Sequence, residues 1–350
     1  MTAGPPPGAA PAAPATPAAP TLVIGEAITD VLTGEDGLRR SRPGGSPANV
    51  ALGLARLGHP VRLATRIGRD GPGRDLHAHL RGSGVRLTPG SFTGGATSTA
   101  TARLDAAGTA HYSFDITWDL PPAALGGPPP SHLHTGSIAT ALAPGAERVF
   151  AAVEAARAGA TVSYDPNVRP ALLATADRER PRAERFVALS DVVKASGEDL
   201  DWLYPGRSPD EAARRWADGS GPALVVVTMG GAGARVFWPG GQCDVPATPV
   251  EVADTVGAGD AFMSGLLSGL LRTGLLAGAG PAAGPDAGPA AGPDAARART
   301  ALRGVTASAR LDRRVASALS LAARAAALTC TREGADPPTR TELARWAAGR

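Results

Sequence analysis

The chain has 350 residues, of which 43% are hydrophobic, so it can bury the core of one large α/β domain or of two small ones. The formal net charge is only +3, and the basic side chains, almost all arginine, are mixed with acidic ones, which argues against a nucleic-acid partner. No run of roughly 18 consecutive apolar residues occurs, so we expect no membrane partner. The two cysteines stand far apart without a C-x-x-C spacing, which favours a cytoplasmic location.

Two segments have the composition of linkers. Residues 1–20 are rich in Pro and Ala and lack the basic start and apolar stretch of a signal peptide, so we expect a disordered tail. The octapeptide GPAAGPDA occurs at residues 280–287 and again at 288–295. This repeat predicts a flexible insertion, over about residues 277–297, between two helices. The rest of residues 21–350 is expected to form one domain.

Strands and helices alternate along most of that domain. Short β-type runs predict strands at residues 21–28, 61–67, 132–138, 161–165, 191–195 and 223–229. The segments between several of them have a helical period, for example residues 145–158 and 209–217. Such alternation predicts an α/β fold with a mostly parallel sheet that helices cover on both faces.

Two early segments depart from this alternation. Residues 31–43 and 97–114 have an antiparallel character, and the sequence DAAG at 105–108 is typical of a hairpin turn. We therefore expect a small β appendage beside the main sheet.

The segment GGSPANVALGLARLG, residues 44–58, predicts a helix with a glycine-rich approach. Ser46 is suited to the N-cap position and is followed by a proline, which fits the first helical turn. Gly44 and Gly45 would let a small ligand approach the backbone, and the amide of Asn49 can donate to and accept from a polyol. A plain helix with a glycine-rich lead explains the same pattern.

The segment DTVGAGDAFMSGLL, residues 254–267, predicts a tight turn that leads into a second helix. Glycines at the start of a helix let unpaired N–H groups converge on an anion, which the helix dipole also favours. Asp260 stands where this helix begins, and a carboxylate beside an anion site suits a phosphoryl-transfer base. By spacing alone, Asp260 fits a simple helix cap equally well.

Several common nucleotide-binding motifs are absent. The sequence has no GxxxxGK[ST] phosphate loop and no GxGxxG that follows a strand and opens a helix. The missing dinucleotide fingerprint disfavours a nicotinamide-linked sugar dehydrogenase.

Together, the segments at 44–58 and 254–267 resemble the two signatures of the PfkB carbohydrate kinase family, also called the ribokinase family. Further similarity, in family order, lies at VIGEAITD (23–30), DPNVRP (165–170), KASGEDL (194–200), TMGGAG (228–233) and CTREGA (330–335). The resemblance extends along nearly all of residues 21–350 and is strongest to bacterial fructokinases. It implies a ribokinase-like three-layer fold whose β appendage is a lid over the sugar.

The resemblance also implies roles for single residues. Asp260 would be the general base that takes the proton of the sugar hydroxyl. The anion hole would be formed by Gly257, Ala258 and Gly259. The sugar hydroxyls would be bound by Asp30, Gly44, Gly45 and Asn49. Asp30 would end the first strand, where side chains face the crevice of an open α/β sheet, although it could instead be a turn or cap residue. Arg169 would face a phosphate or form a structural ion pair.

The ATP site would be lined by Ser196, Thr228, Gly230, Gly231 and Gly233, although the four last-named also fit a hairpin turn. The family pattern Asn-x-x-Glu is replaced here by Ser-Gly-Glu-Asp, so Asp199 would bind Mg²⁺ through water. Asp254 and the Val256 carbonyl match a monovalent-cation loop, so K⁺ is a further candidate cofactor.

The resulting hypothesis is an ATP-dependent sugar kinase, with fructose as the first candidate and 2-dehydro-3-deoxygluconate as the next. A nucleoside kinase and a non-catalytic binding or regulatory relative are the alternatives. Because lid edges often pair in this family, the resemblance also suggests a homodimer through the lid.

Overall fold

The computed structural model describes residues 20–33, 39–104, 110–278 and 292–348. A nine-stranded sheet runs through its centre in the order β13-β12-β11-β10-β9-β8-β1-β4-β5. At one edge, β12 pairs antiparallel with both β11 and β13, and the other neighbours pair parallel. The strands are β1 (Thr21–Ile24), β4 (Val61–Ala64), β5 (Arg86–Leu87), β8 (His132–Gly136), β9 (Thr161–Asp165), β10 (Val192–Ser196), β11 (Leu224–Thr228), β12 (Ala234–Trp238) and β13 (Gly241–Val245). The predicted, mostly parallel sheet is thus confirmed.

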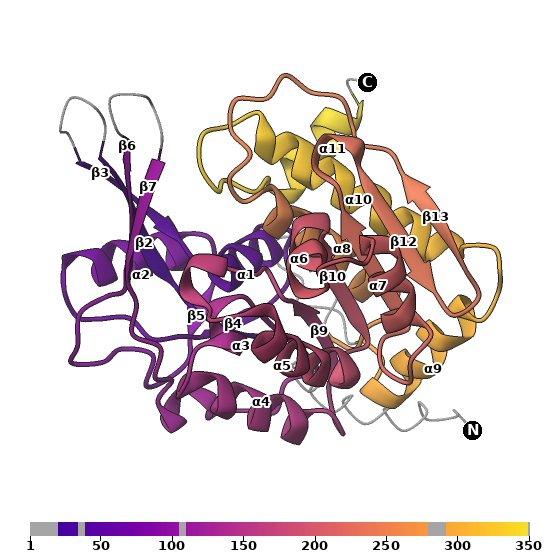
Figure 1. The fold of residues 1–350 in the computed structure, drawn as a ribbon, viewed down its shortest axis with the longest axis horizontal. Coiled ribbons are helices and arrows are strands. Elements are labelled where there is room, and N and C mark those ends of the chain that lie inside the picture. The colour runs from indigo at the N-terminus through magenta and orange to yellow at the C-terminus, as the bar shows by residue number, and fades with distance from the viewer. Residues whose placement is uncertain (1–19, 34–38, 105–109, 279–291, 349–350) are drawn as a thin grey trace, which may run out of the picture.

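Helices cover both faces of this sheet (Figure 1). One face packs against α1 (Ser46–Arg56), α2 (Gly71–Gly82), α8 (Ala258–Arg272), α9 (Ala295–Thr306) and α10 (Arg313–Cys330). The other packs against α3 (Ile138–Ala141), α4 (Gly145–Ala156), α5 (Ala176–Leu189), α6 (Gly197–Leu203) and α7 (Pro209–Ala217). The C-terminal helix is α11 (Arg340–Ala348), and the short 3-10 helices are η1 (Pro122–Leu125), η2 (Pro170–Leu172) and η3 (Gly230–Ala232).

Each strand contributes side chains alternately to these two cores. In β1, Val23 packs on the side of α1 and α8, whereas Leu22 and Ile24 pack on the opposite side. Successive side chains of a strand point to opposite faces, so a strand buried on both sides is apolar throughout. The result is the expected three-layer arrangement. Within the part of the chain that the structure describes, no helix combines the length and apolarity needed to span a bilayer.

A second sheet stands beside the main body, at the left of Figure 1. Its order is β3-β2-β6-β7, with β2 and β6 parallel and the two outer pairs antiparallel. The strands are β2 (Ile28–Thr33), β3 (Arg39–Gly44), β6 (Thr99–Leu104) and β7 (Ala110–Asp115). The expected β appendage is therefore present, and we call this four-stranded sheet the lid sheet. The turn at 105–108 lies outside the described residues.

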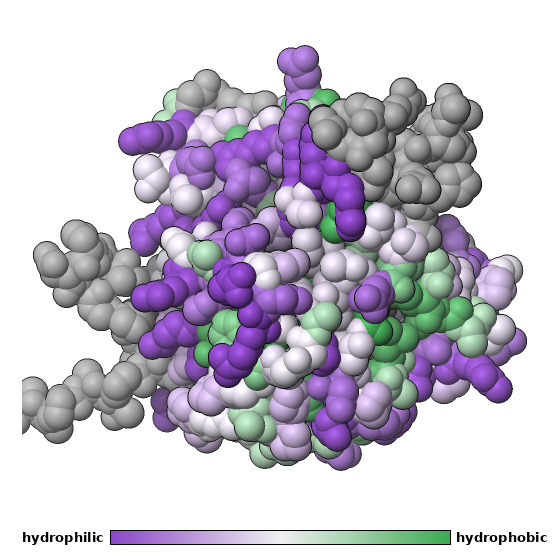
Figure 2. Space-filling model, turned by 90° about the vertical axis from the view of Figure 1, so that its left-hand side faces the viewer, coloured by the Kyte–Doolittle hydropathy of each residue, from purple (hydrophilic) through white to green (hydrophobic). Residues whose placement is uncertain are grey.

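The lid sheet presents a polar surface. Residues 39–42 of β3, with the sequence RRSR, are all exposed. Figure 2 looks onto this side of the molecule and shows mainly hydrophilic side chains in its upper part, next to the grey residues.

The prediction of one strand over residues 21–28 was wrong. The chain leaves the main sheet after Ile24 and enters the lid sheet at Ile28. Between them, Gly25 lies so close to Pro47 that a Cβ would come within 2.2 Å of its ring, and the Ala27 N–H donates to the Thr65 hydroxyl at 3.0 Å. Asp30 consequently lies inside a lid strand. The prediction that it ends the first strand of the main sheet is therefore wrong.

The predicted insertion over residues 277–297 ends in ordered structure. Helix α9 begins at Ala295, and the Asp294 carboxylate caps it by accepting from the Arg297 N–H at 2.9 Å. Ala295 is buried against Ala277 and Ala298. Residues 279–291, which hold most of the octapeptide repeat, and residues 1–19 of the expected tail lie outside the described residues.

Candidate active site

Two helix N-termini meet at Asp260. Helices α1 and α8 pack side by side, and the first turn of α1 faces the first turn of α8. The Ser46 hydroxyl donates to one carboxylate oxygen of Asp260 at 2.6 Å, and the Asn49 amide donates to the other at 2.8 Å. Asp260 itself is only 7% exposed. An ionised carboxylate is acceptor-only, so these two donors fix its orientation and leave lone pairs for a substrate proton.

Ser46 differs from its predicted role. The N-cap of α1 is Gly45, with φ at 101°, and Ser46 is the first residue of the helix. Its side chain therefore points to Asp260 and makes no cap hydrogen bond. The sequence pattern S-P at a helix start does not distinguish these two uses of a serine.

The turn before α8 can hold an anion. Gly257 is the N-cap in a left-handed conformation, with φ at 75°, which a side chain would disfavour. The Ala258 N–H already donates to the Thr255 carbonyl at 3.2 Å, and the Ala261 N–H closes onto Gly257. Since the first amides of a helix have no intrahelical acceptor, Gly259 and Asp260 contribute the N–H groups left for an anion.

Asp30 lies near this centre from the lid side. Its carboxylate lies over Gly44, where a Cβ would come within 2.0 Å of an oxygen. Burial raises the pKa of Asp30 to about 6, Arg169 acts to lower this pKa, and Asp260 acts to raise it. Glu26, at the turn between β1 and β2, has its pKa raised to about 7 by burial. The lid side of the site therefore holds two carboxyl groups that titrate near neutral pH.

Arg169 forms no ion pair among the described contacts. Its guanidinium donates to the backbone oxygens of Asn167 and Val168, at 3.0 and 3.2 Å. Asn167 has a left-handed backbone, with φ at 36°, which is uncommon for a residue with a side chain. The turn after β9 thus holds Arg169 next to the candidate site, where its charge acts on the carboxyl groups of Asp30 and Glu26.

A large cavity opens beside Asp260. Its volume is about 530 Å³, in the range expected of small-molecule sites. Its polar lining includes the predicted residues Arg169, Ser196, Asp199, Thr228, Gly230, Gly231, Gly233, Gly257, Ala258, Gly259 and Asp260. Its apolar lining comes mainly from two segments, with Pro246, Val250, Val252, Ala323, Ala326 and Ala327. Asp30, Gly44, Gly45 and Asn49 do not line this cavity, and Asn49 is linked to it through Asp260.

The predicted nucleotide residues divide into two kinds. Beta carbons placed on Gly230 and Gly231 would meet open space, so these residues border the cavity freely. Gly233 has a φ of 94° in the β11–β12 turn, and a Cβ there would come within 2.2 Å of the Val245 carbonyl oxygen at the end of β13, so this position requires glycine. Both sequence interpretations, a cavity wall and a hairpin turn, therefore apply within one short segment.

Asp199 is part of a capping box. Ser196 caps α6, the Ser196 N–H donates to Asp199 at 2.8 Å, and the Val168 N–H donates to its other oxygen at 2.6 Å. One lone pair remains on each oxygen, and the exposed Glu198 lines the cavity next to it. Mg²⁺ binds through one or two carboxylates together with waters and substrate phosphates, so this donor set fits an ion held through water.

The loop of Asp254 and Val256 is tied to the C-terminal part of the chain. The Asp254 carboxylate accepts from the Val256 N–H at 3.0 Å and from the Gly334 N–H at 2.8 Å. The Asp254 N–H donates to the Cys330 carbonyl at 3.2 Å. This loop leads directly into Gly257, so these hydrogen bonds help to fix the position of the turn before α8.

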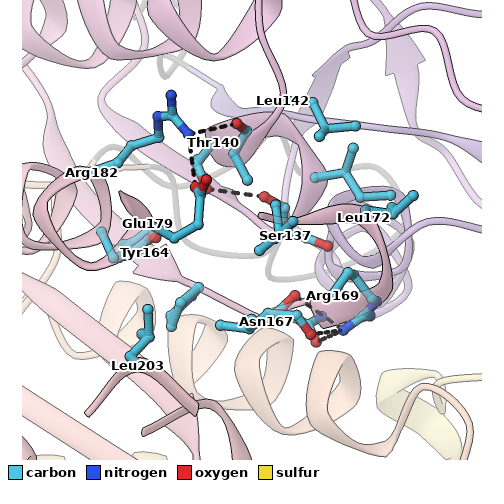
Figure 3. Close-up of a pocket in the computed structure, with 16 residues that line it drawn as sticks. Ser137, Thr140, Leu142, Tyr164, Asn167, Arg169, Leu172, Glu179, Arg182 and Leu203 are labelled. Carbon is cyan, nitrogen blue, oxygen red and sulfur yellow. Dashed lines mark hydrogen bonds and ion pairs between the residues drawn. The ribbon is translucent and has the colours of Figure 1, made fainter. Parts of the chain in front are cut away.

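A second hollow lies close by but has a different character. Figure 3 shows Arg169 and Asn167 on one side of it and the Glu179–Arg182 ion pair on another. Its volume is about 30 Å³, which suits only one or two water molecules. The two cavities share Asn167 and Arg169 in their linings. Of the two, the large cavity has the volume that a nucleotide needs.

Sequence reasoning did not assign Lys194. It lines the large cavity, and its ammonium lies 2.8 Å from an Asp165 carboxylate oxygen. The signal was present, since Lys194 is the sole lysine and lies in a buried strand. The apolar wall from α10 had no such signal, because an alanine-rich helix is equally typical of a core.

The fold and this site define a carbohydrate kinase of the ribokinase-like type, and comparisons with known proteins agree. The model described as pfkB family carbohydrate kinase matches residues 22–284. The chain therefore belongs to the PfkB family.

Curated relatives include fructokinases of two bacteria. The chain is 36% identical to the fructokinase of Klebsiella pneumoniae over 256 residues, which is 70% of this chain and 82% of the relative. It is 35% identical to the fructokinase of Rhizobium leguminosarum bv. trifolii over 260 residues, covering 70% and 78%.

Solved structures support the fold. The ATP-bound fructokinase of Xylella fastidiosa matches with a TM-score of 0.75 at 28% identity, over 94% of this chain and 98% of that one. A fructokinase double mutant of Vibrio cholerae O395, with fructose, ADP and potassium bound, matches with a TM-score of 0.72 at 26% identity, over 94% and 99%.

Proposed function

We propose that this protein is a fructokinase that transfers the γ-phosphoryl group of ATP to a hydroxyl of fructose. The observation that carries the proposal is Asp260, which two donors orient at the N-terminus of α8, beside a cavity of nucleotide size. The names of the bacterial relatives, and the ligands named for the two solved structures, favour fructose and ATP among sugars and donors.

In the proposed reaction, Asp260 takes the proton from the acceptor hydroxyl as its oxygen attacks the γ-phosphorus. The bond from that phosphorus to the ADP oxygen breaks, and the Gly259 and Asp260 N–H groups bind the charge on the phosphoryl oxygens. Such donors act on charge that develops in the transition state, where they accelerate the reaction. Asp30 orients the acceptor from the lid side and Asn49 from the first turn of α1, and Arg169 contributes positive charge at the boundary of the site.

The apolar wall explains where the base of the nucleotide would lie. Val252 is 58% exposed, and with Pro246 and Ala327 it belongs to the apolar lining of the cavity, which the glycine turns also line. A purine ring binds favourably to apolar side chains, and its phosphates to backbone N–H groups. In the proposed complex, ATP would therefore lie with its phosphates toward Asp260.

Mg²⁺ would be held through water by Asp199 and Glu198 together with the phosphates, and it would neutralise phosphate charge. K⁺ would bind at the loop of Asp254 and the Val256 carbonyl and order the turn at Gly257. Replacement of K⁺ by a bulky organic cation should lower kcat a few-fold, and equal rates in both salts would remove this part of the proposal.

A substrate panel tests the function. ATP consumption should be measured in a coupled assay with fructose, ribose, 2-dehydro-3-deoxygluconate and adenosine, using the wild type and Asp260→Asn. We expect fructose to give the highest kcat/KM and the variant to lose sugar-dependent turnover. A higher kcat/KM for another acceptor would reassign the substrate, and no acceptor-dependent turnover would favour a binding or regulatory protein.

A further inference from the structure

The site contains a buried cation that the proposed mechanism has not used. Lys194 lies on β10, its side chain is 4% exposed, and its ammonium nitrogen lies 2.8 Å from the Asp165 carboxylate at the end of β9. Apart from this ammonium, neither Asp165 oxygen has a hydrogen-bond partner among the described residues. The carboxylate therefore depends on the ammonium for its hydrogen bonding, and the ammonium belongs to a residue that lines the cavity.

The Lys194 ammonium lies against the anion-binding turn at the start of α8. A Cβ built on Gly259 would lie 3.1 Å from the Lys194 nitrogen, so the ammonium lies within contact distance of this turn. Lys194, Gly259 and Asp260 all line the same cavity. An ammonium has three N–H donors, and one contact with Asp165 leaves two of them.

Stability alone gives a weak reason for this arrangement. Removing a lysine and an aspartate from water is costly, and well-packed apolar residues of similar volume serve a core as well or better. Burial by itself lowers the pKa of the Lys194 ammonium, but the carboxylates of Asp165, Asp199 and Asp260 raise it above its usual value. Lys194 is therefore a cation at neutral pH, next to the place where phosphoryl charge would develop.

We propose that Lys194 donates a hydrogen bond to a non-bridging oxygen of the phosphoryl group during its transfer, while Asp165 holds the ammonium in place. This inference rests on the proposed kinase function. In the step, the bond to the acceptor oxygen forms, the bond to the ADP oxygen breaks, and the hydroxyl proton goes to Asp260. Lys194 keeps its protons and only binds charge, which is strongest in the transition state.

The first test is Lys194→Met, which keeps the length of the side chain and removes its charge. We expect kcat to fall roughly 10²–10³-fold, the loss typical of one transition-state donor. The fructose KM should stay within about threefold, because the acceptor is bound from the lid side. An unchanged kcat would overturn the inference.

A second variant separates catalysis from folding. Lys194→Met leaves Asp165 as an unpaired buried carboxylate, which costs stability, whereas Lys194→Met combined with Asp165→Asn removes both charges. We expect the double variant to recover Tm toward the wild-type value but not kcat. If kcat returns together with Tm, the pair is only structural and the inference is wrong.

A matched control uses the other end of the same strand. Asp191, just before β10, is 2% exposed and pairs with Arg299 at 3.0 Å and with Arg157 at 3.2 Å, and none of the three lines the cavity. Arg299→Met should lower Tm and leave kcat of the remaining folded enzyme near the wild-type value. A kcat loss in this control as large as that of Lys194→Met would show that the loss is not specific to the site, and would count against the inference.

A binding measurement gives an independent readout. Affinity for ADP alone is compared with affinity for ADP plus aluminium fluoride, Mg²⁺ and the accepted sugar, a mimic of the phosphoryl group in transfer. We expect Lys194→Met to keep the first within a few-fold and to lose most of the second. Equal losses would contradict the inference. If the wild type phosphorylates no acceptor, the proposed function fails; if it does and the Lys194 variants remain fully active, only the inference fails.

Discussion

The phosphoryl end of the site and the lid sheet are built in different ways. At the phosphoryl end, Ser46 and Asp260 are each 7% exposed and are held by two core helices that pack along each other. On the lid side, Asp30 is only partly buried and lies on a four-stranded sheet whose strand β3 exposes four polar residues in succession. One region is part of the core, and the other is attached beside it.

This difference indicates a division of labour. Groups that act on the bond being formed must be held within a fraction of an ångström, which close-packed helices achieve. Groups that recognise the acceptor contact it before and during the reaction, and a sheet beside the core can supply them. We therefore expect substitutions at the phosphoryl end to change kcat and substitutions in the lid sheet to change the sugar KM.

The largest expected effect is at Asp260. Asp260→Asn keeps the shape of the side chain and its place between Ser46 and Asn49, but it removes the carboxylate that acts as the base. Steady-state kinetics should show kcat lower by roughly 10²–10⁴, with the ATP KM little changed. A variant that keeps more than about a tenth of the wild-type kcat would show that the proposed base is wrong.

Asp30→Ala should show the opposite pattern. A hydrogen bond to a charged group contributes about 1.5–3 kcal/mol, so the sugar KM should rise about 10–100-fold. The ATP KM should change little, and kcat should fall less than KM rises, because a misplaced acceptor also reacts more slowly. A loss confined to kcat would contradict the assignment of Asp30 to the acceptor.

The pH dependence sharpens this comparison. Burial raises the pKa of Asp30 to about 6, so the carboxylate gains a proton as the pH falls through that value. The protonated group accepts hydrogen bonds more weakly, and the sugar KM should therefore rise by up to about tenfold per pH unit below pH 6. Asp30→Asn should flatten this rise. If the rise persists in that variant, Glu26, with its pKa near 7, is the titrating group.

Sequence alone predicted the parts that local patterns encode. The glycine turn before α8, the helical segment of α1 and the parallel strands all follow from short motifs and periodicity, and the family comparison agrees with the fold that they form. The split of residues 21–28 was not predicted, because only the three residues Gly25–Ala27 separate β1 from β2, and the contact of Gly25 with Pro47 at that point is not visible in the sequence.

Contacts between residues far apart in the chain could not be predicted from the sequence. The bond from Ser46 to Asp260 spans 214 positions, and the contact of Lys194 with Asp165 depends on neighbouring strands that are paired only in the fold. The roles of the single site residues, the homodimer through the lid and the cytoplasmic location remain predictions.

The smallest expected effect concerns the segment between α8 and α9. The backbones of Gly278 and Gly292 touch, since a Cβ on Gly292 would lie 1.7 Å from the Gly278 carbonyl oxygen. The chain therefore leaves and returns at one point, and residues 279–291 can be replaced by a short glycine link without moving either end. Loop length changes closure entropy only slowly, so Tm should change by less than about 2 °C and kcat/KM by less than about threefold.

A longer deletion provides the matched control, because the boundary of the ordered structure lies at Asp294. Removing residues 279–295 also deletes the cap of α9 and the buried Ala295. Loss of a cap costs about 1 kcal/mol, and the loss of buried contacts adds to it, so Tm should fall by several degrees. The site lies at the other end of α8, and kcat should stay close to the wild-type value at temperatures where the protein is folded. If both deletions lower Tm equally, residues 279–291 themselves contribute to stability. If kcat falls as well, the segment between α8 and α9 affects the phosphoryl end of the site, which would contradict the expected independence of the two regions.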